Sequence, residues 1–176
     1  MYYAVLLRGI NVGGNKKLPM KELRKLLENA GFENVQTYIQ SGNVVLETNL
    51  ENNSAVETAI FELIRESFFE VHVIARSIYQ IESVIAENPF AGEEPDESKF
   101  HLIFAKERIP VGFAQLLTAN ASSSEEYAVS DQEIYCHLKE GVIKSLVGKG
   151  FMEKHIGKAI TARNLRTVKA IAKLVR

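Results

Sequence analysis

The chain has 176 residues, 46% of them hydrophobic, which is enough to bury the core of one domain or of two small ones. Its single cysteine, Cys136, excludes an internal disulfide and a cysteine-rich zinc site, and the opening apolar run is too short for a signal peptide or a membrane span. The net charge of −1 hides two basic ends, since residues 1–30 carry +4, residues 139–176 carry +8 and the middle carries −13. We expect a cytoplasmic protein, with one positive face if the fold joins the two ends; solvated lysine-rich helix faces fit the same charges.

The first half of the chain predicts the element order βαββαβ. Apolar residues at helical spacing mark two helices, and alternating side chains interrupted by a polar break indicate a hairpin. The expected elements are a strand at residues 2–7, a helix between Pro19 and Gly31, a hairpin of residues 35–40 and 44–46, a helix beginning at a capping box of Ser54 and Glu57, and a strand at residues 71–74.

The second half repeats this order in part. A short helix at residues 77–87 ends before Asn88-Pro89, an acidic connecting segment follows, and the last third is helical. The expected elements are a strand at residues 100–105, a helix at 110–117, a hairpin of 127–129 and 134–138, and a final helix whose basic stripe is Arg166, Lys169, Lys173 and Arg176.

These patterns predict an α+β fold with two ferredoxin-like βαββ-type halves, mostly antiparallel sheets and a C-terminal helix. The predicted organisation is an N-terminal ferredoxin-like half at residues 1–88, a connecting loop at 89–98 and a C-terminal α+β half with the terminal helix at 99–176. One compact unit is the alternative.

The segment between the first strand and the first helix carries the strongest functional signal. Its glycines can bring backbone N–H groups close to an anion, and its basic side chains add positive charge. The spacing approaches that of a nucleotide-binding loop, but no hydroxyl residue is placed to hold magnesium, which disfavours a nucleotide hydrolase. A loop whose glycines merely allow tight packing is the alternative. The candidate anion-binding residues here are Arg8, Asn11, Gly13, Gly14, Asn15 and Lys16.

Residues 41–43, Ser-Gly-Asn, break the predicted hairpin. Ser41 lacks a G-x-S-x-G context and a histidine near it in sequence, which argues against a nucleophile. Turn chemistry is favoured, with Asn43 tolerating unusual backbone angles. Hydrogen bonding of Ser41 and Asn43 to a ligand is the alternative.

The segment Thr161-Ala162-Arg163-Asn164 precedes the last helix. Threonine and asparagine favour N-cap positions, so a capped helix alone explains the pattern. A ligand site is the alternative, because helix N-termini attract negative charge and arginine grips phosphates and carboxylates in a bidentate way. Arg163, Asn164 and Arg166 are therefore further candidates for anion binding.

The histidines and the cysteine predict neither a metal site nor a nucleophile. Cys136 lies in a predicted strand, where cysteine is more often a small buried hydrophobe. We expect no metal and no cofactor. The element order invites comparison with the RNA-recognition motif, but its glycine-aromatic signature is absent. The histidines without metal-ligand spacing are His72, His101, His137 and His155.

Four stretches together resemble one known family. They are residues 6–14 (LLRGINVGG), 37–45 (TYIQSGNVV), 88–90 (NPF) and 161–168 (TARNLRTV). The chain is similar over nearly its whole length to the family domain of unknown function 1697 (DUF1697). The resemblance implies a bacterial protein with a compact α+β fold and ferredoxin-like halves, and it supplies no reaction, cofactor or catalytic residue. Leu165 replaces the tryptophan usual in the family, which argues against a stacking role at this position.

Three functions fit these observations. The favoured one is binding of a phosphate-bearing ligand, nucleic acid or nucleotide, where residues 8–17 meet the helix terminus at residues 163–166. The second is an enzyme acting on a small acidic or phosphorylated metabolite held among Arg8, Asn11, Ser41 and Asn43. The third is a non-catalytic structural or self-associating protein whose motifs are folding signals. The patterns assign neither a reaction nor an oligomeric state.

Overall fold

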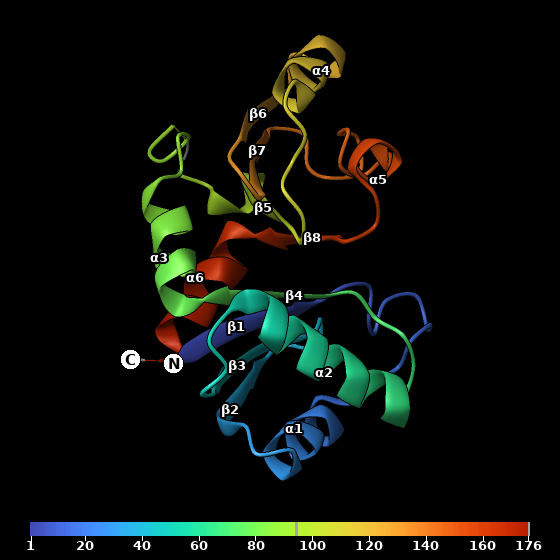
Figure 1. Ribbon diagram of the computed structural model, residues 1–176. Coiled ribbons are helices and arrows are strands. Elements are labelled where there is room, and N and C mark those ends of the chain that lie inside the picture. The colour runs from blue at the N-terminus through green and yellow to red at the C-terminus, as the bar shows by residue number, and fades with distance from the viewer. Residues whose placement is uncertain (94, 176) are drawn as a thin grey trace. The chain divides into compact units, whose positions relative to one another are not determined.

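The computed structural model describes residues 1–93 and 95–175, which form two compact units. Unit 1 is Met1–Ser83 together with the chain from Lys169 onward, and unit 2 is Val84–Val168 (Figure 1). Each unit contains a four-stranded antiparallel sheet, so the predicted α+β class is confirmed. The closer comparison with ferredoxin-like folds and the predicted domain boundaries stay predictions. Among the described residues, no helix is long and apolar enough to cross a membrane.

Unit 1 has the predicted order βαββαβ, followed by a short helix. Its strands are arranged in the order β2-β3-β1-β4, and β1 pairs antiparallel with both β3 and β4. The elements are β1 (Tyr2–Leu7), α1 (Met20–Asn29), β2 (Glu33–Tyr38), β3 (Asn43–Glu47), α2 (Asn53–Ser67), β4 (Val73–Ser77) and α3 (Ile78–Ala86).

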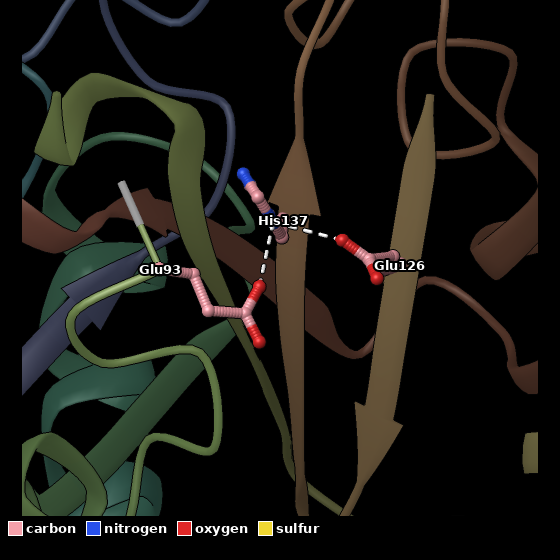
Figure 2. A group of neighbouring side chains, drawn as sticks. All are labelled: Glu93, Glu126 and His137. Carbon is pink, nitrogen blue, oxygen red and sulfur yellow. Dashed lines mark hydrogen bonds and ion pairs between the residues drawn. The ribbon is translucent and has the colours of Figure 1, made fainter. Parts of the chain in front are cut away.

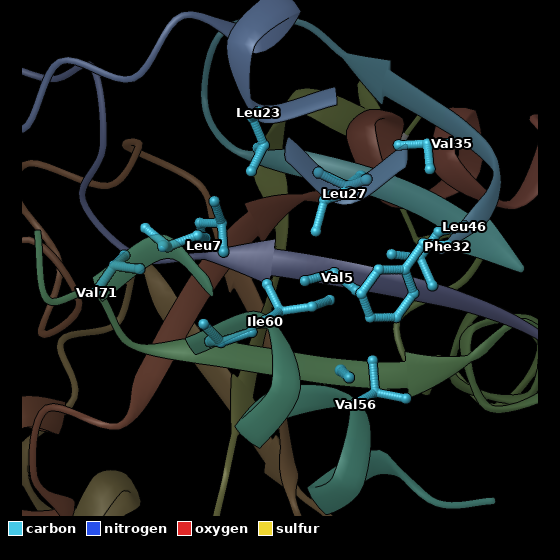
Figure 3. Close-up of a cluster of buried hydrophobic side chains, with 14 of the residues drawn as sticks. Val5, Leu7, Leu23, Leu27, Phe32, Val35, Leu46, Val56, Ile60 and Val71 are labelled. Carbon is cyan, nitrogen blue, oxygen red and sulfur yellow. The ribbon is translucent and has the colours of Figure 1, made fainter. Parts of the chain in front are cut away.

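The core of unit 1 lies between its sheet and the helices α1 and α2. Leu23 and Leu27 occupy the apolar stripe of α1, and Ile60 lies on that of α2. These side chains pack with Val5 and Leu7 of β1, and all five are buried (Figure 3). The apolar residues at helical spacing on α1 and α2 therefore pack in one core with alternate residues of β1. This core holds the C-terminal end of β1 in place.

Unit 2 has a strand order that corresponds to that of unit 1. The order is β6-β7-β5-β8, with β5 paired antiparallel to β7 and β8. The elements are the 3₁₀ turn η1 (Glu97–Lys99), β5 (Phe100–Ala105), α4 (Phe113–Asn120), β6 (Glu125–Val129), β7 (Glu133–Leu138), α5 (Phe151–Ile156), β8 (Ile160–Asn164) and α6 (Leu165–Lys173), the last of which ends in unit 1.

The expectation that the last third is wholly helical is wrong at β8. Its five residues pair along β5, from Ile160 opposite Ala105 to Asn164 opposite His101. A strand this short, with polar residues at three positions, has a weak local signal and depends on its neighbour for stability. With β8 included, unit 2 also reads βαββαβ, so the predicted repeat of element order extends to both units.

The start of α2 corrects a second expectation. Asn52 is the N-cap, and its side chain accepts a hydrogen bond from the backbone N–H of Ala55 (2.9 Å). Glu57 does not reach back to a cap at Ser54. It is buried, and its Oε1 accepts a hydrogen bond from the backbone N–H of Ala75 (2.9 Å). The buried backbone N–H of Ala75 on β4 needs an acceptor, and Glu57 supplies it instead of capping α2.

Some element boundaries also differ from those predicted, and two predictions include positions outside the described residues. Both α4 and β4 begin two or three residues later than predicted, which is the usual error in locating ends from sequence. The predicted connecting loop at 89–98 contains residue 94, and the predicted basic stripe contains Arg176. Both of these positions lie outside the described residues.

Replacing the cap tests this account of α2. We expect Asn52→Ala to lower the free energy of unfolding by about 1 kcal/mol, because the Ala55 N–H loses its acceptor. Ser54→Ala is the matched control and should change stability by less than about 0.5 kcal/mol. Urea unfolding followed by circular dichroism measures both. A larger loss in Ser54→Ala than in Asn52→Ala would contradict the assignment.

Candidate functional site

The loop between β1 and α1 folds back as a small hairpin. Asn11 N–H donates to the carbonyl of Lys16 (3.1 Å), and Asn15 N–H donates to that of Val12 (3.3 Å). Gly13 and Gly14 form its tip with φ of 60° and 78°, as the two central residues of a type I′ turn require. Among the described residues, the backbone N–H groups of these two glycines have no hydrogen-bond partner. The tip therefore offers two donors to solvent.

The side chain of Asn11 fixes this hairpin to the neighbouring turn. Its Nδ2 donates to the carbonyl oxygens of Leu18 (2.9 Å) and Gln40 (2.7 Å), and its Oδ1 accepts from Leu18 N–H (2.8 Å). Three of the four hydrogen bonds that an asparagine side chain can form are thus used inside unit 1. Asn11 therefore holds the loop in place, and its predicted contact with a ligand stays a prediction.

The turn between β2 and β3 is held in the same way. Asn43 is fully buried, and its Nδ2 donates to the carbonyl of Tyr38 (3.1 Å) and to Ser41 Oγ (3.0 Å). Leu7 N–H donates to the carbonyl of Gly42 (2.8 Å), which ties the turn to the end of β1. Ser41 and Asn43 therefore hold the turn through their side chains, but the unusual backbone angle expected at Asn43 is found instead at Ile39 and Gly42.

Two exposed apolar residues stand on these joined turns. Val12 is 63% exposed and Ile39 is 52% exposed. Ile39 also has a φ of 51°, which β-branched residues rarely adopt and which costs of order 1–3 kcal/mol. An apolar side chain held in a strained and exposed position does nothing for the core of unit 1.

Basic side chains follow the hairpin tip along the chain. Lys16 Nζ donates to the carbonyl of Glu70 (2.8 Å) and lies 5.8 Å from the centroid of the Phe69 ring. Lys17 and Lys21 are exposed, the first in the loop and the second in the first turn of α1. The segment around the hairpin tip is therefore basic, with no acidic residue between Arg8 and Lys21 in the chain.

The three other candidate residues lie in unit 2. Arg163 is 9% exposed, and its Nη1 donates to Thr161 Oγ1 (2.6 Å) and to the carbonyl of Ala162 (2.8 Å). Burial lowers the pKa of its guanidinium to about 10. Asn164 Oδ1 accepts from Arg166 N–H (2.9 Å), as expected of an N-cap, and Arg166 pairs with Asp96 (3.1 Å). All three are engaged within unit 2, and a site shared with the unit 1 loop stays a prediction.

Cys136 has the surroundings of a structural residue. It is 1% exposed on β7, and burial raises the pKa of its thiol well above the ordinary value. Its Sγ lies 3.7 Å from the carbonyl of Ile134. A thiol held protonated in the core is a poor nucleophile, which agrees with the structural role expected from the sequence.

One cluster of chemical groups was missed by the sequence patterns. Glu93, Glu126 and His137 place three metal-ligating atoms within 4.8 Å of one another in unit 2 (Figure 2). His137 Nδ1 lies 3.0 Å from Glu126 Oε2 and 3.3 Å from Glu93 Oε2. Glu126 and His137 are cross-strand partners on β6 and β7. The predicted hairpin, 127–129 with 134–138, begins one residue too late to include Glu126, and its register extended by that residue would have paired the two.

The comparisons with known proteins give a family and a fold. The family described as "Protein of unknown function (DUF1697)" matches residues 1–135. The structure of a conserved bacterial protein from Streptococcus pneumoniae, SP0830, is similar with 26% sequence identity and a TM-score of 0.78, covering 99% of this chain and 98% of that one. No curated protein matches the sequence.

The close contact between the β2–β3 turn and the loop after β1 can be tested at one glycine. A Cβ on Gly42 would lie 2.8 Å from both Leu7 Cβ and Ile10 Cδ1, at a φ of 77°. We expect Gly42→Ala to lower the free energy of unfolding by about 2–4 kcal/mol, from backbone strain and overpacking together.

Gly31→Ala is the matched control for this substitution. Gly31 has a φ of 91°, and an added Cβ would meet no atom of the described residues within 4 Å, so only the backbone strain of about 1–2 kcal/mol applies. Chemical unfolding of the two variants separates strain from packing. Equal losses in both would refute the close contact.

Proposed function

The chain belongs to the DUF1697 family, and we propose that it binds a phosphate-bearing polymer, a nucleic acid, on the hairpin loop of unit 1. The observation that carries the proposal is the pair of N–H groups at Gly13 and Gly14, which have no hydrogen-bond partner in the described part of the chain. Such donors suit a phosphate oxygen, since both remain solvated without a ligand and both are fixed by the turn. The lysines at positions 16, 17 and 21 supply the charge that attracts a polyanion.

The apolar residues on the joined turns support a polymer over a free phosphate. Val12 and Ile39 are exposed, and Asn11 bonds the Val12 hairpin to the carbonyl of Gln40 next to Ile39. A nucleic acid presents bases or sugars beside each phosphate, and apolar side chains can contact those groups. Inorganic phosphate has no apolar part, so binding of phosphate alone would not account for the strained backbone at Ile39.

The internal hydrogen bonds argue against an enzyme that uses Ser41 and Asn43. Asn43 is fully buried, and both residues serve the turn. Two hollows in unit 1, of about 430 and 440 Å³, are lined by other parts of the chain. The same hydrogen bonds favour the third hypothesis for these residues, folding signals, while leaving the glycine tip and its lysines for the ligand.

Salt and charge removal test the binding. We expect full-length protein to bind a fluorescent oligonucleotide with an affinity that falls steeply as salt rises. The double variant Lys17→Gln/Lys21→Gln should reduce the magnitude of the slope of log K against log salt by roughly 2, since each lysine that neutralises a phosphate accounts for about one unit of slope. Fluorescence anisotropy at several salt concentrations measures both quantities.

Arg24→Gln is the matched control on the same helix. Its side chain already pairs with Glu28 at 2.7 Å, so its loss should leave the slope unchanged. The proposal fails if no oligonucleotide binds, if binding is insensitive to salt, or if Arg24→Gln has the same effect as the double variant.

A substitution at Ile39 separates binding from stability. Asparagine tolerates the left-handed region better than isoleucine, so Ile39→Asn should leave the free energy of unfolding equal or higher by up to about 1 kcal/mol. If the exposed side chain contacts the ligand, the same variant should bind the oligonucleotide several-fold more weakly. Unfolding and anisotropy are measured on one preparation, and unchanged affinity would remove Ile39 from the surface.

A further inference from the structure

Unit 2 contains a group of side chains with the composition of a metal site, apart from the loop of unit 1. We propose that Glu93, Glu126 and His137 bind a divalent transition-metal ion, with Zn²⁺ as its probe. One imidazole nitrogen and two carboxylate oxygens are ligands that such ions accept. Figure 2 shows the two carboxylates approaching the ring of His137 from different elements.

The two distances from His137 to the carboxylates are those of ligands around one ion. Two atoms bound to a tetrahedral Zn²⁺ at about 2.0–2.1 Å lie roughly 3.3 Å apart. His137 Nδ1 lies 3.0 Å from Glu126 Oε2 and 3.3 Å from Glu93 Oε2. A metal would bind Nδ1 in its deprotonated form together with the two carboxylate oxygens, and any proton displaced from these atoms would pass to solvent.

The ring of His137 is held firmly by its surroundings. It is 3% exposed, and the rings of Phe90 and Phe100 have centroids 5.9 and 4.7 Å from its own. The register fixes its backbone as well, since His137 pairs with Phe100 on one side and with Glu126 on the other. A ligand with a fixed position loses little entropy when it binds an ion.

Glu93 is brought to the cluster by the turn at residues 88–90. Asn88 Oδ1 accepts a hydrogen bond from Phe90 N–H (3.1 Å), and Glu93 N–H donates to the carbonyl of Phe90 (3.2 Å). Phe90 in turn packs on the His137 ring, so the turn and the ligand are positioned together. The Asn-Pro-Phe motif thus has a physical role that its sequence did not reveal.

The site is open to an ion from solvent. The side chains of Glu93 and Glu126 are 46% and 43% exposed, while the ring between them is buried. Three protein ligands with a solvent-facing side is the pattern of zinc sites that keep a water molecule in the fourth position. One group opposes the ion: Lys139 Nζ lies 3.2 Å from Glu126 Oε2. Its ammonium must turn away, and its side chain is exposed enough to do so.

Titration of tag-free, full-length protein with Zn²⁺ after treatment with a chelator tests the site. We expect one equivalent to bind and the melting temperature to rise. Glu93→Gln and Glu126→Gln each keep the size of the side chain and should raise the Kd for Zn²⁺ at least about tenfold. Lys139→Met should lower it roughly fivefold, because a positive charge next to the ion is removed.

Two variants control for surface binding in general. Glu107→Gln removes an exposed carboxylate, and His155→Gln removes an exposed imidazole, both outside the cluster. Both should leave the Kd unchanged. The proposal is overturned if the unsubstituted protein binds no stoichiometric Zn²⁺, if the two cluster variants bind as tightly as the controls, or if Lys139→Met fails to strengthen binding. Either of the first two results would mean that the three residues only interact with one another and do not bind a metal ion.

Discussion

Each unit depends on one strand that is hydrogen-bonded along both edges and buried on both faces. In unit 1 this is β1, where every residue from Tyr3 to Leu7 is at most 1% exposed, and in unit 2 it is β5. A strand so enclosed cannot shift its register, because a slip of one residue would exchange its two buried faces. The chain segments at its ends are therefore fixed points. The hairpin loop follows one end of β1, and Phe100, beside His137, begins β5.

Several polar residues near these fixed points serve the folding of their own unit. Asn11, Asn43 and Arg163 all stood out in the sequence, and each donates hydrogen bonds to groups of its own unit. A conspicuous polar residue can satisfy backbone groups that secondary structure leaves unpaired. What remains for a ligand in the loop is backbone, at Gly13 and Gly14, together with flexible lysine side chains whose charge acts over several ångströms.

The sequence predicted elements well where local pattern and packing agree, as in α1 with its proline start and glycine end. The prediction failed where the local structure depends on a residue far away in the sequence. Residues 160–164 form a strand because β5 offers an edge, and Glu57 turns inward because Ala75 needs an acceptor. The cluster in unit 2 is of the same kind, since Glu126 and His137 are eleven residues apart and meet only through the register of a hairpin. Spacing rules for metal sites do not cover that geometry.

The correspondence between the two units shows that strand order does not determine their chemistry. The loop after β5 contains neither the paired glycines nor the run of lysines found after β1, and its Arg108 pairs with Asp131. At the end of the β2–β3 hairpin, Asn34 donates to Glu47 and holds the pKa of that carboxyl below its ordinary value; the corresponding hairpin of unit 2 has Glu126 and His137 there. An amide donates a hydrogen bond to a carboxylate without compensating its charge, whereas two carboxylates beside one imidazole nitrogen concentrate negative charge and metal-ligating atoms at one place. The two hairpins therefore differ in chemistry, because one ends in a hydrogen bond from an amide to a carboxylate and the other in an imidazole beside two carboxylates.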